Sequence, residues 1–373
     1  MTDEPISILI VDDSALYRQS IQNVMREIPG VSVVGVARNG VEALEKIRQL
    51  DPDLLTLDVQ MPDMDGIELL RAIKANGLRA AAIMVSSFTA EGAQVTTDAL
   101  MEGAFDFILK PSSTDSNQNR QQLRDALQHR IDAFRTSRVR GPSRESRASD
   151  GDSGDQNLSP GRLFPPRSRG TVPSPTSRCR LVIIGASTGG PAALKQVLPK
   201  FPPTTPAPIA VVQHMPERYT ASLAQRLDEI CPCRVVEASD RMPLESGKIV
   251  VAKGGHHLKL TQSISGQLFA TLGEDPPVNG VRPAVDVLIE SAVDALGGDS
   301  LAIILTGMGC DGLRACHKLK SAGGHVFAQS RDDCVVYGMP RAIVNDGLAD
   351  RTLSLAQMAP ATLRHLKRSQ RGG

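Results

Sequence analysis

Three residue types that together carry out acyl transfer occur in the second half of this 373-residue chain, each after an apolar run. Ser187 lies in Gly-Ala-Ser-Thr-Gly at 185–189, which fits the G-x-S-x-G pattern of a nucleophile elbow. His214 ends the apolar run 209–214, and Asp311 follows the run 301–305 in a glycine-rich loop. A serine nucleophile needs a base, and the base needs an acid that orients it. The three residues therefore form a candidate hydrolytic site.

Each of these residues also has a simpler interpretation. The glycine loop alone fits an anion-binding loop or a structural turn equally well, although the dinucleotide spacing and the P-loop lysine are both absent. An aspartate in the place of Asp311 is a common helix N-cap, and a single histidine at a strand end is often structural. The compatible roles of the three favour chemistry: Ser187 attacks, His214 moves the proton, and Asp311 holds the imidazole tautomer.

The order Ser…His…Asp along the chain differs from the Ser…Asp…His order of α/β-hydrolases. We therefore expect that this site and that of the α/β-hydrolases evolved the same chemistry independently. The oxyanion that forms during attack needs backbone N–H donors. The amide of Thr188, next to the nucleophile, and that of Met308, in the glycine loop, are the candidates.

Acidic residues end two apolar runs in the first half of the chain. Asp12 and Asp13 follow the first run, and Asp58 ends the run 54–58. Carboxylates that converge repel one another and need a hard cation, for which Mg²⁺ is suited. Two later runs end in Ser86 (or Ser87) and Lys110. A hydroxyl, a lysine and Mg²⁺ around a carboxylate form a phosphoryl-acceptor site.

Taken singly, these acids are ordinary loop residues, and a lysine before a proline is ordinarily exposed to solvent. Their joint occurrence with D-x-x-M-P-x-x-D-G at 58–66 favours a common site.

The elements that must position these residues alternate between strands and helices. In the first half, strands at 6–13, 31–37, 54–58, 81–87 and 105–109 alternate with helices at 15–27, 40–48, 67–75, 91–101 and 119–134. Such alternation predicts a flavodoxin-like (β/α)5 fold with a parallel sheet. In the second half, strands at 180–187, 208–214, 248–253, 300–307 and 325–329 predict a doubly wound, mainly parallel-sheet α/β domain. Ligands of such sheets bind at the carboxyl ends of the strands.

A change in composition separates the two halves. Residues 141–178 are rich in Gly, Pro, Ser and Arg and have few apolar residues, which is typical of a flexible linker. Its arginines also allow a functional basic patch. We expect a first domain at 1–135, a linker at 136–178 and a second domain at 179–373.

Composition excludes several classes of protein. The net charge of +1, the 3% of aromatic residues and the lack of Trp argue against nucleic-acid binding. No apolar run approaches the ~18 residues that span a bilayer, so we expect no membrane insertion. The acidic start of the chain predicts no signal peptide. Six scattered cysteines fit reduced thiols, and we expect a cytoplasmic protein.

The motifs of the first half resemble those of response-regulator receiver domains over residues 6–125. The resemblance implies that Asp58 is phosphorylated, that Asp12, Asp13 and Asp58 hold Mg²⁺, and that Ser86 and Lys110 contact the phosphoryl group. Phe107 occupies the place of the family's aromatic switch residue but lacks the hydroxyl of the commoner Tyr.

The motifs GASTGG, QHMP, LTGMGxDG and NGVRPAVD (279–286) resemble the catalytic domain of the chemotaxis protein-glutamate methylesterases. The family's catalytic residues map onto Ser187, His214 and Asp311, whereas its P-G before a later His reads Lys253-Gly254 here. The resemblance implies hydrolysis of glutamate methyl esters, and deamidation of glutamines, on chemoreceptors. It also implies a chemotaxis histidine kinase as phosphodonor and no cofactor in the catalytic domain. The sequence leaves the oligomeric state open, and a monomer is the default expectation.

The order of the domains suggests regulation. The hypothesis is that the unphosphorylated receiver packs over the Ser187 cleft and that phosphorylation of Asp58 releases it. Three rival functions are a non-catalytic binding module, a DNA-binding transcription regulator and a carboxylesterase for small molecules. The glycine loops and strand-rich pattern argue against DNA binding, whereas only substrate tests separate the two esterases.

Overall fold

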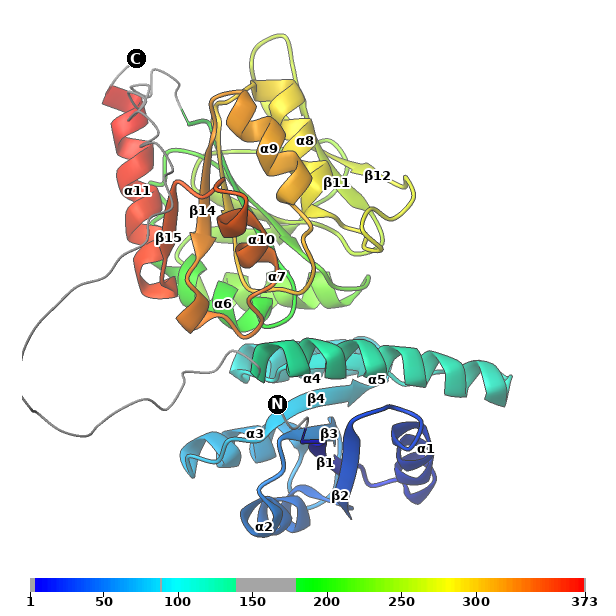
Figure 1. The fold of residues 1–373 in the computed structure, drawn as a ribbon. Helices are drawn as coiled ribbons and strands as arrows, with labels where there is room; N and C mark the ends of the chain where they lie inside the picture. The colour runs from blue at the N-terminus through cyan, green and yellow to red at the C-terminus, as the bar shows by residue number, and fades with distance from the viewer. Residues whose placement is uncertain (1–3, 88, 139–178, 372–373) are drawn as a thin grey trace, which may run out of the picture.

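Two parallel sheets organise the chain, one in each half, and the computed structural model describes residues 4–87, 89–138 and 179–371 (Figure 1). The first sheet has the order β2-β1-β3-β4-β5 and the second β15-β14-β13-β6-β7-β10-β8. All pairs within both sheets are parallel. These sheets confirm the α/β class predicted for both halves.

The N-terminal half, residues 4–138, is called the receiver half after the family its motifs resemble. It consists of five strands and five helices in strict alternation. They are β1 (Ile6–Val11), α1 (Ala15–Met25), β2 (Val31–Ala37), α2 (Gly40–Leu50), β3 (Leu54–Asp58), α3 (Gly66–Ala75), β4 (Ala81–Ser86), α4 (Ala90–Glu102), β5 (Asp106–Leu109) and α5 (Ser116–Arg138). Helices α1 and α5 cover one face of the sheet, and α2, α3 and α4 cover the other.

Local sequence sets where several of these helices begin. Ser14, Asn39 and Thr89 each accept a hydrogen bond from a first-turn amide, as N-cap residues do. Asp65 and Glu68 form a reciprocal capping box at the start of α3. The strands β3 and β4 are almost wholly buried, as expected for a sheet covered on both faces.

The C-terminal half, residues 179–371, contains the candidate hydrolytic residues and is called the catalytic half. It has a seven-stranded sheet between two layers of helices. Its sheet strands are β6 (Leu181–Ala186), β7 (Ile209–Gln213), β8 (Arg234–Glu237), β10 (Lys248–Val251), β13 (Ser300–Ile304), β14 (His325–Gln329) and β15 (Arg351–Leu353). Its helices are α6 (Gly190–Val197), α7 (Tyr219–Ile230), α8 (Val285–Leu296), α9 (Leu313–Ser321), α10 (Met339–Asn345) and α11 (Leu355–Arg371), with short 3₁₀ turns at Leu198–Lys200 and Arg331–Asp333. Helices α6, α7 and α11 contribute to one core, and α8, α9 and α10 to the other.

A small antiparallel sheet is added to the side of α8. It consists of β9 (Met242–Pro243), β11 (His257–Gln262) and β12 (Leu268–Gly273), in the order β11-β12-β9. The sequence pattern did not predict these strands, nor β8 and β15. None of the described helices combines the length and the apolar composition that crossing a bilayer requires.

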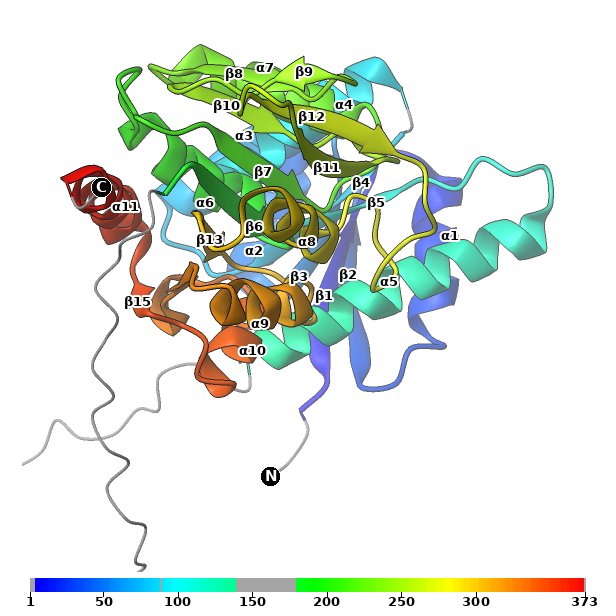
Figure 2. The ribbon, with the colours of Figure 1, turned by 90° about the horizontal axis from the view of Figure 1, so that it is seen from above.

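The two halves pack directly against each other: α4 of the receiver contacts α6 and α7, and buried residues of α5 share a cluster with Val336 (Figures 1 and 2). Apolar side chains of α4 and β5 belong to the same buried cluster as those of α6 and α7. Two ion pairs flank this contact, Lys195–Glu102 at 3.3 Å and Arg226–Asp98 at 2.7 Å. Helix α5 continues to Arg138, and residues 139–178 of the predicted linker lie outside the described residues.

Candidate active site and phosphorylation site

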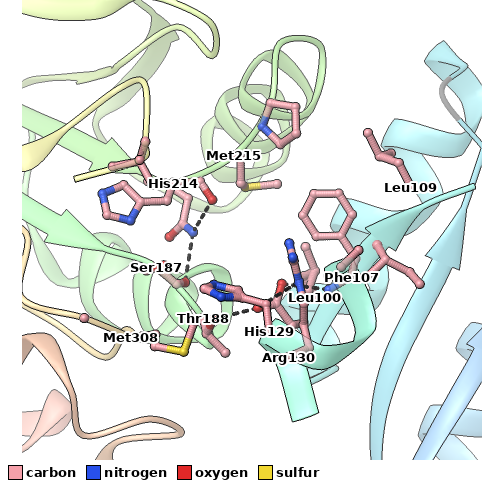
Figure 3. Close-up of a pocket in the computed structure, with 18 of the residues that line it drawn as sticks. Leu100, Phe107, Leu109, His129, Arg130, Ser187, Thr188, His214, Met215 and Met308 are labelled. Atoms are coloured by element: carbon pink, nitrogen blue, oxygen red, sulfur yellow. Dashed lines mark hydrogen bonds and ion pairs between the residues drawn. The ribbon is translucent and has the colours of Figure 1, made fainter. Parts of the chain in front are cut away.

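The three candidate catalytic residues follow three neighbouring strands of the catalytic sheet. Ser187 comes directly after β6, His214 directly after β7, and Asp311 lies in the loop between β13 and α9. Because β13, β6 and β7 are adjacent and parallel, their carboxyl ends meet at one edge. The residues predicted from sequence are therefore brought together, and Figure 3 shows Ser187 and His214 on the same side of the cleft.

The imidazole of His214 is bonded to the predicted acid. Its Nε2 lies 2.8 Å from Asp311 Oδ2. No hydrogen bond joins Ser187 Oγ to this ring anywhere in the part of the chain that the structure describes. Because Nε2 bonds Asp311, Nδ1 is the nitrogen that can act as the base. In structures without substrate, the hydrogen bond between a nucleophile and its base is often long or poorly aligned, and it tightens when substrate binds.

Asp311 is buried and held in its ionised form. Its side-chain oxygens accept hydrogen bonds from the backbone amides of Val285, at 2.6 Å, and Asp286, at 3.1 Å, at the start of α8. Burial alone would raise the pKa of this carboxyl, but the hydrogen bond and charge of His214 and these amides outweigh it and lower the pKa below its ordinary value. The residue can therefore stabilise a positively charged imidazole.

Backbone contacts fix the turn that carries Ser187. Its N–H donates to Thr306 O at 3.0 Å, and its carbonyl accepts from Gln213 Nε2 at 2.9 Å. A Cβ on Gly307 would lie 2.7 Å from Ser187 Cβ and 2.5 Å from Met339 Sδ, so this position accepts no side chain without movement. The glycine in the loop after β13 is thus needed for close approach to the nucleophile.

The two amides predicted as oxyanion donors lie in the same region. Thr188 and Met308 both line the cleft that contains Ser187. Within the described ranges, neither backbone N–H has an acceptor in the protein. Both amides are therefore free to donate to an oxyanion, and their role stays a prediction.

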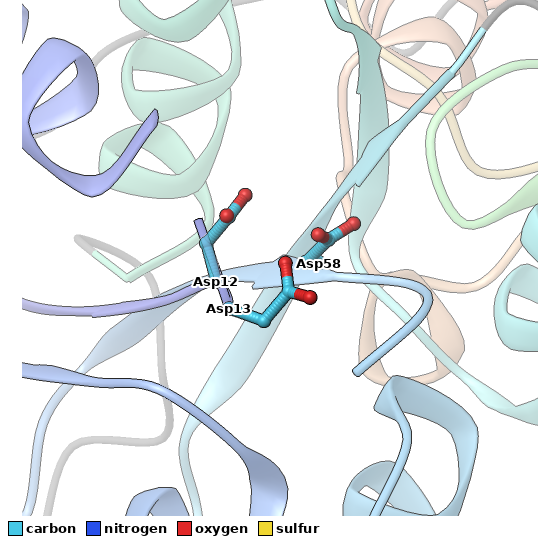
Figure 4. A group of neighbouring side chains, drawn as sticks. All are labelled: Asp12, Asp13 and Asp58. Carbon is cyan, nitrogen blue, oxygen red and sulfur yellow. The ribbon is translucent and has the colours of Figure 1, made fainter. Parts of the chain in front are cut away.

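The receiver carries a compact group of carboxylates at the ends of β1 and β3. Ligand atoms of Asp12, Asp13 and Asp58 lie within 4.8 Å of one another (Figure 4). Lys110 Nζ pairs with Asp58 Oδ2 at 2.8 Å and with Asp12 Oδ2 at 3.1 Å. Three carboxylates supply the oxygen ligands that Mg²⁺ prefers, so the donor set fits that ion.

Burial makes Asp58 unlike an ordinary surface aspartate. Burial, together with the nearby Asp12 charge, raises its pKa to about 6, although the hydrogen bond from Lys110 acts in the opposite direction. For Lys110, burial alone would lower the pKa, but the hydrogen bonds and charges of Asp58 and Asp12 raise it overall. The lysine is thus held as a cation beside the carboxylate.

Ser86, the predicted switch hydroxyl, points away from this acidic group. Its Oγ accepts a hydrogen bond from Thr96 Oγ1 at 2.7 Å and lies 3.3 Å from the hydroxyl of Tyr219 in the catalytic half. Tyr219 also donates to Ser87 O at 3.3 Å, and its ring stacks on Phe107 with centroids 4.7 Å apart. A tyrosine of the other domain therefore stacks on Phe107 and places its hydroxyl beside Ser86.

The receiver also forms one wall of the hydrolytic cleft. The cleft has a volume of about 1050 Å³ and is lined by Ser187, His214 and Asp311 together with His129 and Arg130 of α5 (Figure 3). Thr188 Oγ1, next to the nucleophile, donates to Asp106 Oδ2 of the receiver at 2.6 Å. The receiver thus contacts the residue whose amide is a candidate oxyanion donor.

Comparison with known proteins identifies both halves. Residues 182–362 match the family model described as CheB methylesterase, and residues 8–124 match that of the response regulator receiver domain. A protein-glutamate methylesterase/protein-glutamine glutaminase of Nocardioides sp. is 41% identical over 98% of this chain and 96% of its own length. The chain belongs to the CheB methylesterase family. It is a hydrolase with a response regulator receiver domain.

Another full-length relative and one solved domain are also similar to this chain. The protein of the same name from Thermotoga maritima is 39% identical over 95% of this chain and 96% of its own length. The crystal structure of the Thermotoga maritima CheB methylesterase catalytic domain is 40% identical, covers 50% of this chain and 98% of that chain, and has a TM-score of 0.49.

Three residues of this methylesterase-family site were not assigned a role from the sequence. Gln213 donates to the carbonyl of Ser187, Tyr219 contacts Ser86 of the receiver, and Asn279 contacts Asp311. Asn279 lies within the NGVRPAVD motif, which was noted only as a resemblance. For Tyr219 the sequence offered no signal, because its partners belong to another domain.

Replacing Asp311 by Asn tests the acid. We expect the labelling of Ser187 by a fluorophosphonate probe to slow by about 10³- to 10⁴-fold, because an amide favours the wrong imidazole tautomer. The rate is measured by mass spectrometry of the intact protein. Asp346→Asn is the matched control, because Asp346 bonds His317 Nε2 at the same 2.8 Å but on the surface. Equal labelling rates in the two variants would contradict the role of Asp311.

Proposed function

We propose that this protein hydrolyses the γ-methyl esters of glutamate residues on chemoreceptors and deamidates selected glutamines at the same site. The proposal is supported by relatives named protein-glutamate methylesterase/protein-glutamine glutaminase that span almost the whole chain. The observation that carries it is the His214–Asp311 pair beside Ser187 at three adjacent strand ends. We further propose that it acts as a monomer in the cytoplasm.

The chemistry follows from the positions of these residues. Ser187 Oγ attacks the ester carbonyl carbon while His214 Nδ1 accepts its proton, and Asp311 stabilises the resulting imidazolium. The amides of Thr188 and Met308 donate to the oxyanion of the tetrahedral intermediate. His214 then returns the proton to the leaving methoxide, so that methanol departs and an acyl-serine remains. Water, deprotonated by His214, hydrolyses that ester to the glutamate carboxylate.

A second chemical step takes place in the receiver. An oxygen of Asp58 attacks the phosphorus of a phosphohistidine on a chemotaxis histidine kinase, the P–N bond breaks, and the histidine leaves. Asp12, Asp13 and Asp58 would hold Mg²⁺ at this site. When bound, the ion would supply positive charge that stabilises the phosphoryl group. Lys110 Nζ, which is already paired with Asp58, adds a second cation at the same place.

The contact between the domains links this step to hydrolysis. In this structure the Ser86 hydroxyl is hydrogen-bonded to Thr96 and Tyr219. Asp106 accepts a hydrogen bond from the hydroxyl of Thr188. A phosphoryl group on Asp58 competes for the Ser86 hydroxyl, which withdraws it from Tyr219. The loss of this bond weakens the packing of β4, β5 and α4 against the catalytic half and opens the cleft.

Methanol release from methylated receptor membranes tests the activity. Wild-type protein should release methanol, and a small phosphodonor with Mg²⁺ should accelerate release. Ser187→Ala should lose on the order of 10⁴-fold or more of the rate, because the nucleophile is gone. Asp58→Asn should keep basal release but lose stimulation.

Asp51→Asn is the control for Asp58→Asn. Asp51 is the exposed C-cap residue of α2, and its backbone has a left-handed conformation that Asn adopts readily. It should remain fully stimulated. The absence of methanol release from the wild type under all conditions would overturn the proposed substrate.

Replacing Tyr219 by Phe tests the link between the domains. The ring still stacks on Phe107, but the hydroxyl that contacts Ser86 and Ser87 O is lost. One net hydrogen bond stabilises a state by about 1 kcal/mol, so basal methanol release should rise about two- to tenfold. The rate of the fully phosphorylated protein should stay unchanged, which serves as the internal control. Unaltered basal release and unaltered stimulation would contradict this link.

A further inference from the structure

Helices α8 and α9 cap each other through two buried aspartates. The N-cap residues of the helices, Ala284 and Gly312, make no side-chain cap. Instead, Asp311, just before α9, accepts from the first two amides of α8. Asp286, in the first turn of α8, accepts from Ala315 N of α9 at 2.9 Å. Each helix start is therefore satisfied by a carboxylate from the other helix, and one of these carboxylates is the candidate catalytic acid.

This reciprocal capping brings two negative charges together in a buried place. Asp311 is 4% exposed and Asp286 is 2% exposed. Burial and the charge of Asp311 raise the pKa of Asp286, whereas its hydrogen bonds act in the opposite direction. Two close carboxylates away from water repel each other strongly unless a donor lies between them.

A single amide group lies between them. Asn279 Nδ2 is 2.9 Å from Asp311 Oδ1 and 3.0 Å from Asp286 Oδ2, so its two hydrogens point to the two acids. Apart from His214, Asn279 supplies the sole side-chain hydrogen bond to Asp311 among the described residues. The cationic side chain of Arg314 also approaches Asp286, with Nε 3.7 Å from Oδ2, but it is mostly exposed.

The backbone holds Asn279 in place for this contact. Val278 and Val281 exchange two hydrogen bonds, at 3.1 and 3.0 Å, which close a tight turn around it. Asn279 has a φ of 55°, in the left-handed region that Asn tolerates better than most residues. Asn is thus suited to the position both by its backbone preference and by its two amide hydrogens.

We propose that Asn279 is a positioning residue of the hydrolytic site, which acts by bridging Asp286 and Asp311 and so fixing the orientation of Asp311 towards His214. The proposal rests on the Ser187–His214–Asp311 site of the proposed function but not on the identity of the ester. Without the bridge, the charge of Asp286 pushes Asp311 away from its position, and the imidazole loses its alignment with Ser187.

Replacing Asn279 by Ala removes the bridge. We expect both fluorophosphonate labelling of Ser187 and the kcat of methanol release to fall about 30- to 100-fold, because small misplacements of catalytic groups have effects of this size. KM should change less than twofold, since Asn279 acts through Asp311. Asn345→Ala, an exposed asparagine at the end of α10, is the matched control and should label at the wild-type rate.

A second substitution separates positioning from a general loss of structure. Asp286→Asn removes the repelling charge and supplies a new amide donor beside Asp311, so the double variant Asn279→Ala/Asp286→Asn should label at least fivefold faster than Asn279→Ala alone. A residue needed only for folding would show no such recovery, and thermal melting of each variant measures that effect directly.

The outcomes separate this proposal from the proposed function. If the wild type is labelled but releases no methanol, only the proposed substrate is overturned, because the labelling rates of the variants still decide whether the bridge exists. Wild-type labelling in Asn279→Ala, or no recovery in the double variant, would overturn the bridge even if methanol release is normal. No labelling of the wild type would overturn both the hydrolytic site and the bridge.

Discussion

The backbone pairing of three adjacent parallel strands is the constraint on which the hydrolytic site depends. Ile304 of β13 pairs with Gly185 of β6, and Ala186 of β6 pairs with Gln213 of β7. Because β6 and β7 end at the same level, Ser187 and His214 leave the sheet side by side. The loop after β13 is longer and returns Asp311 to the same edge. A change in this register would separate groups that are far apart in the sequence.

Parallel strands that end at one edge of a sheet also form the acidic site of the receiver, and the proposed link between the two sites depends on where those strands lie. The receiver carries Asp12, Asp58, Ser86 and Lys110 at the carboxyl ends of its own parallel strands. Its β4 and β5 form the side of that sheet that faces the catalytic half, through Ser86 and Asp106. The carboxylate of Asp58, the proposed phosphoryl acceptor, is therefore separated from the catalytic half by one strand, and the hydroxyl of Ser86 on that strand contacts the catalytic half directly.

The sequence predicted what depends on local pattern and missed what depends on contacts across the fold. The strand runs and their polar ends led directly to Ser187, His214 and Asp311, because strand-end loops converge in any parallel α/β sheet. The small sheet was missed because β9 has two residues, and because β11 and β12 include polar residues and lie among turn residues instead of forming continuous apolar runs. Asn279 and Tyr219 were missed for another reason: their partners are 32 and 133 residues away, and neither residue type marks such a contact.

The two aspartates at the centres of these sites show how surroundings determine what a carboxylate does. Asp311 accepts from His214, Asn279 and two helix amides, so it stays ionised and fixed, as an orienting group should. Asp58 accepts from Lys110 and the Val59 amide, and burial together with the charge of Asp12 raises its pKa. An oxygen with few fixed donors remains available for a new bond to phosphorus. The hydrogen bonds that make Asp311 a good support would make it a poor phosphoryl acceptor, and the reverse holds for Asp58.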